Sequence, residues 1–500
     1  MTQALRILFA TPELAPWVKA GGLGDVAQAL PAALARAGVD VRILVPAYPA
    51  LKNAFAQAQC VATLEAPGAP GGALAPARVL LTASTPPLYL LECDAYYARA
   101  GGPYQTPQNT DWPDNHLRFG LLSRVAALIG SVQPTQGLGD WRPDVVHCND
   151  WQTGLAPAYL ASESGTHAAS VMTVHNLAYQ GLFSPDVLDS LGLSATLHAT
   201  HAIELWDSIS FLKAGLRFAH RLTTVSPSYA REIQGSALGF GLEGLLSERS
   251  DVLVGILNGV DTETWNPARD PLLVERYDAT QLERKTTNRV ALQRELGLQP
   301  HADAPLFGMI ARLVEQKGVD LVAEIAPELA RAGAQLVVLG QGERRFEEAF
   351  LALAQRHPDA IAVRIGFDEA LAHRIEAGAD LFLMPSRFEP CGLNQLYSMR
   401  YGTPPIVRRT GGLADSVYDA DEVAESESTG FVFDAPDAGA LMDAVRRALE
   451  RFGDRGAWSA LQRNGMRSDF SWAAAARAYV DVYRNAMQAR DAAHAAARAG

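Results

Sequence analysis

Several charged residues of this 500-residue chain lie beside glycines or short apolar runs, where a phosphate could be bound. Residues 19–25 read KAGGLGD and lie between an apolar run and an amphipathic helical pattern. Backbone N–H groups of a glycine turn and of a helix N-terminus would point to one spot there, which suits a phosphate. The glycine spacing is not that of a dinucleotide fingerprint, and the lysine precedes the glycines instead of following them as in a P-loop. A plain tight turn with a solvated lysine is the alternative.

A second pair of charges, Arg312 and Lys317, follows the apolar run 306–310. Ligands of open α/β sheets bind at the carboxyl ends of strands, where this pair is expected. A guanidinium can grip a phosphate with two parallel hydrogen bonds while an ammonium adds a mobile point charge. The pair would therefore suit a diphosphate leaving group, although two exposed surface cations are equally compatible with the sequence.

A third candidate is the segment 385–395, PSRFEPCGLNQ, which follows the apolar run 381–384. A helix is expected to start near Gly392, so that the N–H groups of Gly392, Leu393 and Asn394 would receive a phosphate. Glu389 would then face the group attached to that phosphate. Cys391 is expected to be a small semi-buried side chain rather than a nucleophile, since no neighbouring feature lowers its pKa.

Glycines and polar residues follow other apolar runs as well. Gly411 and Gly412 come after residues 405–408, where the backbone could approach a ligand closely. In the first half, HCND and VHN end two apolar runs at residues 147–150 and 174–176. Polar residues at such strand ends line the same crevice, although a single histidine there is more often a structural hydrogen-bonding residue.

The elements that would position these residues form two βαβ series. Short, almost wholly apolar runs predict buried parallel strands at 6–10, 41–45, 88–91, 144–148, 171–175 and 221–226, and again at 306–310, 335–339, 361–365, 380–384 and 405–408. Helical patterns such as residues 25–37 separate them. The sequence therefore predicts two doubly wound domains, residues 1–254 and 255–470, followed by a closing helix and tail at 471–500.

Composition limits the classes of function. Apolar residues make up 48% of the chain, charged residues 20%, and the net charge of −12 disfavours nucleic acid and anionic membranes as partners. The four cysteines form no CxxC pair, which argues against a zinc ribbon or a secreted disulfide framework. No targeting segment and no long apolar run is evident, so a cytoplasmic protein is expected.

Taken in order, the motifs resemble those of bacterial glycogen synthases and plant starch synthases: KAGGLGD, HCNDW, VHNLAYQG, TVSPSYA, LNGVD, ARLVEQKG, PSRFEPCGLNQLY and RRTGGLADSV. The likeness extends from Lys19 to about Val417. It implies a GT-B fold of two Rossmann-like domains facing a central cleft, with the C-terminal helix crossing back. It also implies retaining transfer of glucose from ADP-glucose to the 4-hydroxyl at the end of an α-1,4-glucan, without a cofactor or a catalytic metal.

The resemblance assigns roles residue by residue. The catalytic positions match Asp150, His175, Arg312, Lys317 and Glu389. Substrate-binding positions match Lys19, Gly21, Gly22, Asp25, Tyr104, Asn176, Asn258, Phe367, Cys391, Gly392, Leu393, Asn394, Gly411 and Gly412. The two cations would bind the diphosphate, Glu389 and residues 391–394 would line the sugar and the distal phosphate, and the ring of Phe367 would stack on the nucleobase.

Departures from the family pattern are few. Ala20 stands where many members carry threonine or valine, Asn394 where bacterial members often carry threonine, and Phe367 where tyrosine is common. Tyr397 stands where many other retaining transferases of this fold place a second glutamate, which favours the synthase branch. The sequence does not decide whether ADP-glucose or UDP-glucose is the preferred donor, and it does not decide the oligomeric state.

Two other classes of function are compatible with parts of the pattern. A nicotinamide-dependent oxidoreductase could use two Rossmann-like halves, but the first strand lacks the expected GxGxxG. A non-catalytic glucan-binding protein could keep the fold while losing charge at the donor site, yet Lys19, Arg312, Lys317 and Glu389 are all present.

Overall fold

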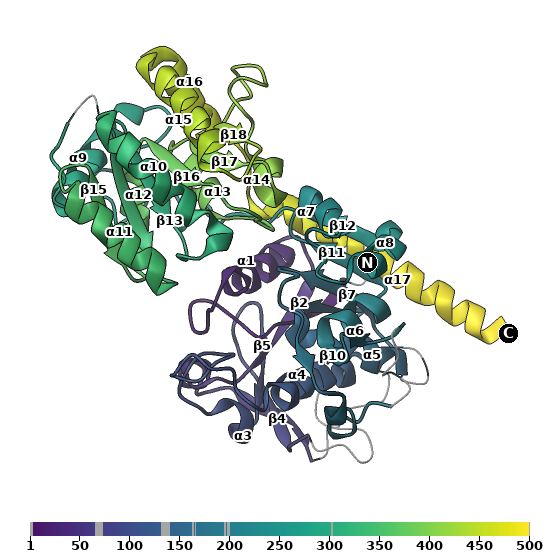
Figure 1. Ribbon diagram of the computed structural model, residues 1–500. Coiled ribbons are helices and arrows are strands. Elements are labelled where there is room, and N and C mark those ends of the chain that lie inside the picture. Colours follow the sequence, from purple (N-terminus) through teal and green to yellow (C-terminus); the bar gives the residue numbers. More distant parts are fainter. Residues whose placement is uncertain are drawn as a thin grey trace. The chain divides into compact units, whose positions relative to one another are not determined.

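The computed structural model describes residues 4–499 except 66–73, 132–140, 163–164, 166, 195–196, 198–200 and 302–303. It divides into two compact units (Figure 1). Unit 1 comprises Met1–Gly259 and Trp472–Gly500, and unit 2 comprises Val260–Ser471. The first unit ends later than the expected residue 254 because its last strand, β12 (Leu253–Gly255), still pairs with the sheet of unit 1.

Unit 1 is built on a sheet of nine strands in the order β12-β11-β7-β6-β1-β2-β5-β4-β3. Its strands are β1 (Arg6–Ala10), β2 (Asp40–Pro46), β3 (Gln59–Leu64), β4 (Ala77–Leu81), β5 (Leu88–Glu92), β6 (Val145–Asn149), β7 (Ala169–Val174), β11 (Arg221–Thr224) and β12. All pairs are parallel except those that β4 makes with β3 and β5. The strand order reverses between β1 and β6, so a ligand site is expected beyond the carboxyl ends of these two strands.

Unit 2 contains a parallel sheet of six strands in the order β15-β14-β13-β16-β17-β18. Its strands are β13 (Leu306–Ile310), β14 (Gln335–Gly340), β15 (Ile361–Ile365), β16 (Leu381–Met384), β17 (Pro405–Arg408) and β18 (Phe431–Phe433). This is the doubly wound order of dinucleotide-binding folds, with its switch point between β13 and β16. Ligands of such sheets bind beyond the carboxyl ends of those two strands.

Helices cover the sheets of both units. Those of unit 1 are α1 (Gly22–Arg36), α2 (Pro49–Ala54), α3 (Asp94–Tyr97), α4 (Asn115–Gly130), α5 (Leu155–Ser162), α6 (Phe211–Phe218), α7 (Pro227–Glu232), α8 (Glu243–Glu248) and α17 (Trp472–Ala499). Those of unit 2 are α9 (Lys285–Glu295), α10 (Val319–Arg331), α11 (Arg344–Arg356), α12 (Glu369–Gly378), α13 (Asn394–Arg400), α14 (Gly411–Ser416), α15 (Ala438–Gly453) and α16 (Arg455–Arg467). None of the helices within the described ranges is long and apolar enough to cross a membrane.

The C-terminal helix α17 packs against α1 and β7 of unit 1. Its buried residues are Trp472, Ala475, Ala476, Tyr479, Val482, Tyr483 and Ala486. They form one stripe along the helix, with Val480 and Met487 half-buried at its margin. The hydroxyl of Tyr483 lies 2.8 Å from His147 Nδ1, and His147 Nε2 lies 2.6 Å from Thr173 Oγ1. His147 therefore fixes the helix to the sheet rather than serving the candidate site.

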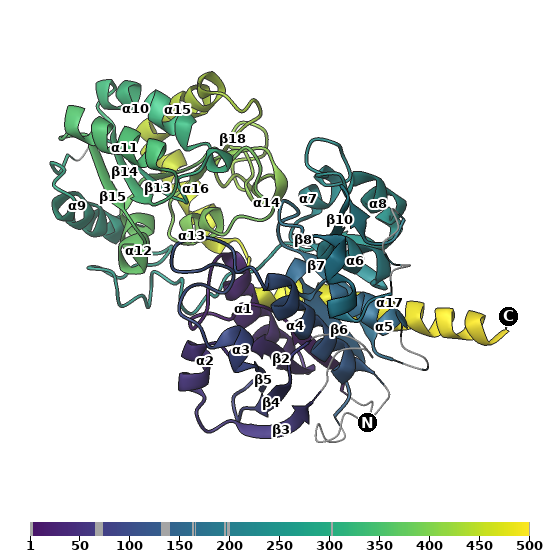
Figure 2. The same cartoon turned by 60° about the horizontal axis from the view of Figure 1, so that its bottom comes forward.

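A separate small sheet in unit 1 joins β8 (Leu182–Phe183), β10 (Ser208–Ser210) and β9 (Glu204–Leu205), all antiparallel (Figure 2). Its strands have two or three residues, which is too short for the alternation on which a strand prediction depends. The strand β10 leads directly into α6, whose N-cap Ser210 accepts a hydrogen bond from the backbone N–H of Lys213.

Candidate functional site

At the switch point of unit 1, Glu13 supports the glycine turn that follows β1. Its Oε2 accepts hydrogen bonds from the backbone N–H groups of Ala20 (2.7 Å) and Gly21 (3.2 Å), and its Oε1 accepts one from the hydroxyl of Tyr104. Glu13 is buried, and burial raises the pKa of its carboxyl. Glu13 carries no signal in the sequence, because it is a lone glutamate in TPELAPW without a partner at a characteristic spacing. The structure makes it the residue that joins Tyr104 to the glycine turn.

The glycine turn itself leads into α1, which begins at Gly22 and so three residues before the expected start at Asp25. Gly21 is the N-cap, in an extended conformation, and a Cβ there would meet nothing within 4 Å. Lys19 Nζ forms a 2.8 Å ion pair with Asp25 in the first turn of the helix. The turn therefore presents open space beside a cation and a helix start, which are the elements expected of an anion site.

Asp150 and His175 follow the neighbouring strands β6 and β7 and are brought together by the sheet. The backbone N–H of His175 donates to Asp150 Oδ1 (2.7 Å), and His175 Nε2 lies 2.9 Å from Asn149 Oδ1. Since Asn149 Oδ1 is an acceptor, the proton of the neutral ring is on Nε2. Burial raises the pKa of Asp150 to about 7 and lowers the pKa of His175 to about 3. The imidazole is therefore neutral at physiological pH, while the carboxyl titrates there.

Two further asparagines of unit 1 were expected at the site. Asn176 is half-buried, directly follows His175, and uses its Oδ1 to accept a hydrogen bond from the backbone of Ala178 (3.1 Å). Asn258 is buried, and its Oδ1 has no hydrogen-bond partner within the part of the chain that the structure describes. A buried acceptor without a partner costs free energy unless a ligand or a water satisfies it.

In unit 2 the expected charges meet at the switch point between β13 and β16. Lys317 Nζ forms a 2.5 Å ion pair with Glu389 Oε2, which also accepts a hydrogen bond from Ser386 Oγ (3.0 Å). The side chain of Glu389 is 7% exposed and that of Lys317 is 20% exposed. Arg312, which follows β13, is exposed. The structure thus brings Lys317 and Glu389 into contact and leaves Arg312 at the surface of the same strand end.

The segment after Glu389 differs from the expectation in detail. Helix α13 begins at Asn394 and not at Gly392, because Gly392 has a left-handed backbone (φ 70°). The side chain of Asn394 donates to the carbonyl of Ile310 (2.7 Å), which ties α13 to the end of β13. Asn394 is therefore used structurally, and its predicted contact with a ligand would have to come from its backbone N–H.

The two glycines at the start of α14, Gly411 and Gly412, have a packing role that the sequence did not reveal. A Cβ at Gly411 would overlap the carbonyl oxygen of Glu389, and one at Gly412 would overlap that of Cys391. The backbone N–H of Gly412 donates to the carbonyl oxygen of Glu389 (3.1 Å). At these glycines the backbone of α14 therefore lies close to the backbone of the segment that carries Glu389. A contact with ligand at either glycine stays a prediction.

Phe367 is exposed and Cys391 is buried, and the contacts predicted for both with the donor stay predictions. Phe367 is 76% exposed in the turn between β15 and α12, so one face of its ring is free to stack on a planar group. Cys391 is buried, as expected for a small packing residue. Leu393 is half-buried immediately before α13.

Other acidic residues and cavities of unit 2 are not part of this site. Asp419 and Asp421, which could be mistaken for a metal-binding DxD, form ion pairs with Arg447 (2.9 and 2.7 Å).

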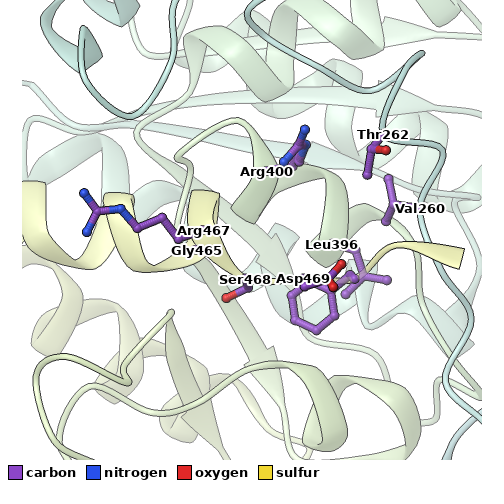
Figure 3. A pocket seen from close by; sticks show the side chains of 9 residues that line it. Val260, Thr262, Leu396, Arg400, Gly465, Arg467, Ser468 and Asp469 are labelled. Carbon is purple, nitrogen blue, oxygen red and sulfur yellow. The ribbon is translucent and has the colours of Figure 1, made fainter. Parts of the chain in front are cut away.

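A cavity of about 150 Å³ is lined by Val260, Thr262, Leu396, Arg400, Gly465, Arg467, Ser468, Asp469 and Phe470 (Figure 3). Figure 3 shows the guanidinium of Arg467 pointing away from the other labelled side chains, so polar groups do not converge there.

Comparison with known proteins places both units in glycosyltransferase families. Residues 6–248 match the family described as starch synthase catalytic domain, and residues 297–463 match glycosyl transferases group 1. The chain is 56% identical to a glycogen synthase of Dechloromonas aromatica over 491 residues, which are 97% of this chain and 99% of the relative. It is 51% identical to a glycogen synthase of Nitrosospira multiformis, with 96% and 97% covered.

Solved structures agree with these relatives. The catalytic domain of starch synthase IV from Arabidopsis thaliana, solved bound to ADP and acarbose, is 33% identical with a TM-score of 0.83, covering 97% of this chain and 100% of that one. Sucrose-phosphate synthase from Thermosynechococcus elongatus is 18% identical with a TM-score of 0.58, covering 97% and 100%, and shows the fold alone. The GT-B glycosyltransferase fold expected from the sequence is confirmed.

Proposed function

Because this chain belongs to the glycogen synthase family, a family of glycosyltransferases, we propose that it moves glucose from ADP-glucose to the 4-hydroxyl at the non-reducing end of an α-1,4-glucan. The observation that carries the proposal is the ion pair of Lys317 with Glu389 at the switch point of unit 2. It places a cation for a departing phosphate beside a carboxylate that can face the sugar. The ADP bound to the starch synthase IV relative supports the choice of nucleotide.

We propose that leaving-group stabilisation is the main catalytic effect. As the bond between C1 of glucose and the β-phosphate oxygen breaks, negative charge grows on ADP. Lys317 and Arg312 offset that charge, and preorganised partners of this kind are worth roughly 10² to 10³ in rate each. In unit 1, Lys19 supplies a further cation, and the start of α1 at Gly22 supplies backbone N–H groups for the same donor.

Retention of configuration is the second part of the proposal. The acceptor 4-hydroxyl attacks C1 from the face that ADP leaves, and its proton passes to the departing phosphate oxygen, so no side-chain base is needed. His175 is neutral and holds its Nε2 proton toward Asn149, which suits a hydrogen-bonding role with the sugar rather than proton removal. Asp150, Glu389 and the amide of Asn176 would orient the hydroxyl groups of glucose and balance the positive charge that develops at C1.

We further propose that the reaction needs no metal ion. The cations Lys19, Arg312 and Lys317 take the place that a divalent ion would have beside the diphosphate. Treatment with EDTA should leave the rate of ADP release unchanged. A loss of activity that Mg²⁺ or Mn²⁺ restores would contradict this part of the proposal.

The experiment that tests the function is a transfer assay with maltotetraose as the acceptor. We expect release of one ADP for each glucose added, and an α-1,4 linkage in the NMR spectrum of the maltopentaose formed. The same assay with UDP-glucose measures donor preference, and ADP-glucose should give the higher kcat/KM. A β-linked product would rule out retention, and a higher kcat/KM with UDP-glucose would rule out the proposed donor.

A further inference from the structure

The hairpin of β9 and β10 carries an exposed tryptophan at its turn. Its two turn residues, Trp206 and Asp207, have φ of 54° and 60°, and Trp206 is 61% exposed. Turns of this kind favour Asn, Asp and Gly, because a bulky side chain is strained in the left-handed region. A large indole that lies mostly in solvent contributes little to the core. Its presence at a strained position points to a binding role at the surface.

One edge of the indole packs against a neighbouring part of the backbone. A Cβ at Gly241 would lie 2.6 Å from Trp206 Cζ2, so the edge of the ring rests against the backbone of that glycine. Glu204 Oε1 accepts a hydrogen bond from the backbone N–H of Asp207 (2.9 Å), which closes the turn. The ring therefore offers a fixed flat surface, and binding to it loses little side-chain freedom.

The surface around Trp206 is connected to the candidate site through Gln180. The carbonyl of Gln180 accepts hydrogen bonds from Ser210 Oγ (3.0 Å) and from the backbone N–H of Leu212 (3.2 Å), at the base of the hairpin. Its side-chain Nε2 donates to the carbonyl of Phe240 (2.8 Å), directly before Gly241. Gln180 belongs to the same segment after β7 as His175. The hairpin that carries Trp206 and the segment of Gly241 are thus both hydrogen-bonded to Gln180, in the segment that carries the predicted sugar-binding residue His175.

We infer that Trp206 binds a glucose unit of the α-1,4-glucan at a distance from the end that receives glucose. The inference rests on the proposed function, which makes a glucan the acceptor. The C–H face of a glucose ring packs on an aromatic face, and its hydroxyls donate to carboxylates such as those of Asp207 and Glu204. A neutral glucan is not repelled by the net charge of −12, whereas nucleic acid or an anionic membrane would be.

A contact of the glucan with Trp206, in addition to the contact of its reacting end, affects the KM of long acceptors only. Once a long chain is held at Trp206, its free end is at a high effective concentration near the site, so its KM falls. An acceptor as short as maltotriose reaches only the site of transfer, so its KM does not change.

The test variant is Trp206→Asn, because asparagine tolerates the left-handed turn and the substitution removes only the ring. Its melting temperature should equal or exceed that of the wild type.

In affinity electrophoresis through gels containing glycogen, we expect the dissociation constant of Trp206→Asn to be roughly threefold to tenfold higher than that of the wild type. The KM for glycogen should rise to a similar degree, while kcat/KM with maltotriose and the KM for the donor stay unchanged. Trp206→Phe, which keeps a ring, should recover part of the loss. Tyr418→Ala, at an exposed aromatic residue (47%) of unit 2, is the matched control and should behave as the wild type.

Equal retardation of Trp206→Asn and wild type by glycogen would overturn the inference. A change in the molecular mass in solution without a change in retardation would overturn it too, since Trp206 would then bind a second copy of this chain. The gel assay does not depend on glucose transfer. Loss of retardation in the variant would therefore support the glucan contact even if the wild type failed to use ADP-glucose. Failure of the glucan contact is thus distinguishable from failure of the proposed function.

Discussion

In the proposed reaction, the contact between Lys317 and Glu389 would combine two charge types, a cation for the departing phosphate and a carboxylate for the sugar. Neither charge is free to move far, since Glu389 is also held by Ser386 and is almost fully buried. Preorganisation of this kind makes the pair effective in the transition state, because little reorganisation accompanies the reaction.

Removal of the Lys317 amine should affect catalysis more than folding. We expect Lys317→Ala to lower kcat roughly 10²-fold to 10³-fold. The free energy of unfolding should fall by at most about 3 kcal/mol, since the carboxylate of Glu389 keeps the hydroxyl of Ser386. Steady-state kinetics and urea unfolding measure the two effects. Arg344→Ala, at a surface cation that is 89% exposed, is the control. Wild-type turnover in Lys317→Ala would contradict the assignment.

Asp150 predicts a pH dependence of stability. The pKa of its carboxyl is about 7 in the folded protein and about 4 in an unfolded chain, so the folded state binds the proton more tightly. Ionisation of Asp150 therefore lowers stability progressively between about pH 4 and about pH 7, and the full penalty applies above that range. Asp150→Asn removes the charge and keeps an oxygen to accept the N–H of His175.

The free energy of unfolding of Asp150→Asn relative to wild type should consequently increase as the pH is raised from about 5 to about 8. Chemical denaturation at several pH values measures it, and the difference should be small at the acidic end. A difference that does not change with pH would show that Asp150 is already ionised throughout this range.

Single residues were predictable only where a pattern surrounded them. Lys317 and Glu389 lie in distinctive motifs after apolar runs, and the structure brings them together. Glu13 had no such pattern, since its partners are backbone N–H groups of the glycine turn and the distant Tyr104. The use of the Asn394 side chain to hold Ile310 was equally invisible, because that contact joins the start of α13 to the end of β13, which are far apart in the sequence.

At the scale of elements, the parallel strands were the most predictable. The predicted runs 6–10, 306–310, 361–365 and 405–408 coincide with β1, β13, β15 and β17. Strands buried on both faces are almost wholly apolar, so their ends are visible where polar residues begin. The strands β3, β4, β8, β9, β10, β12 and β18 were not predicted. Apart from β4, they are short or lie at edges, where pairing partners rather than local sequence decide the conformation.

The start of α14 supports the segment of Glu389, which leads to a prediction for its glycines. Gly412→Ala would place a Cβ against the carbonyl of Cys391 and push that segment away. We expect a loss of about 1–3 kcal/mol in stability together with a fall in kcat, because Glu389 is displaced from Lys317. Gly453→Ala, at the end of α15 where a Cβ would meet nothing within 4 Å, is the matched control.

Thermal unfolding and transfer kinetics distinguish the two glycine variants. Gly453→Ala should leave kcat unchanged and keep or raise the melting temperature, since alanine is the better helix former. An unchanged kcat in Gly412→Ala would mean that the segment of Glu389 tolerates the displacement, and that α14 does not position the carboxylate.

At the scale of the whole molecule, two doubly wound units each present their candidate residues at a topological switch point. In unit 1 most of these residues follow β1, β6 and β7, and in unit 2 the charged ones, Arg312, Lys317 and Glu389, follow β13 and β16. The division into two such domains was evident from the two βαβ series in the sequence. The central proposal is functional: we expect groups of both units to act on the same ADP-glucose.

Binding of ADP, measured by isothermal titration calorimetry, tests that claim most directly. The variants are Lys19→Ala in unit 1, Lys317→Ala in unit 2, and the two combined. We predict that each single change weakens ADP binding by roughly tenfold, which is about 1.4 kcal/mol. The double variant should bind ADP more weakly than either single one. Wild-type affinity for ADP in Lys19→Ala, with a loss in Lys317→Ala alone, would contradict the account, because unit 1 would then take no part in binding the nucleotide.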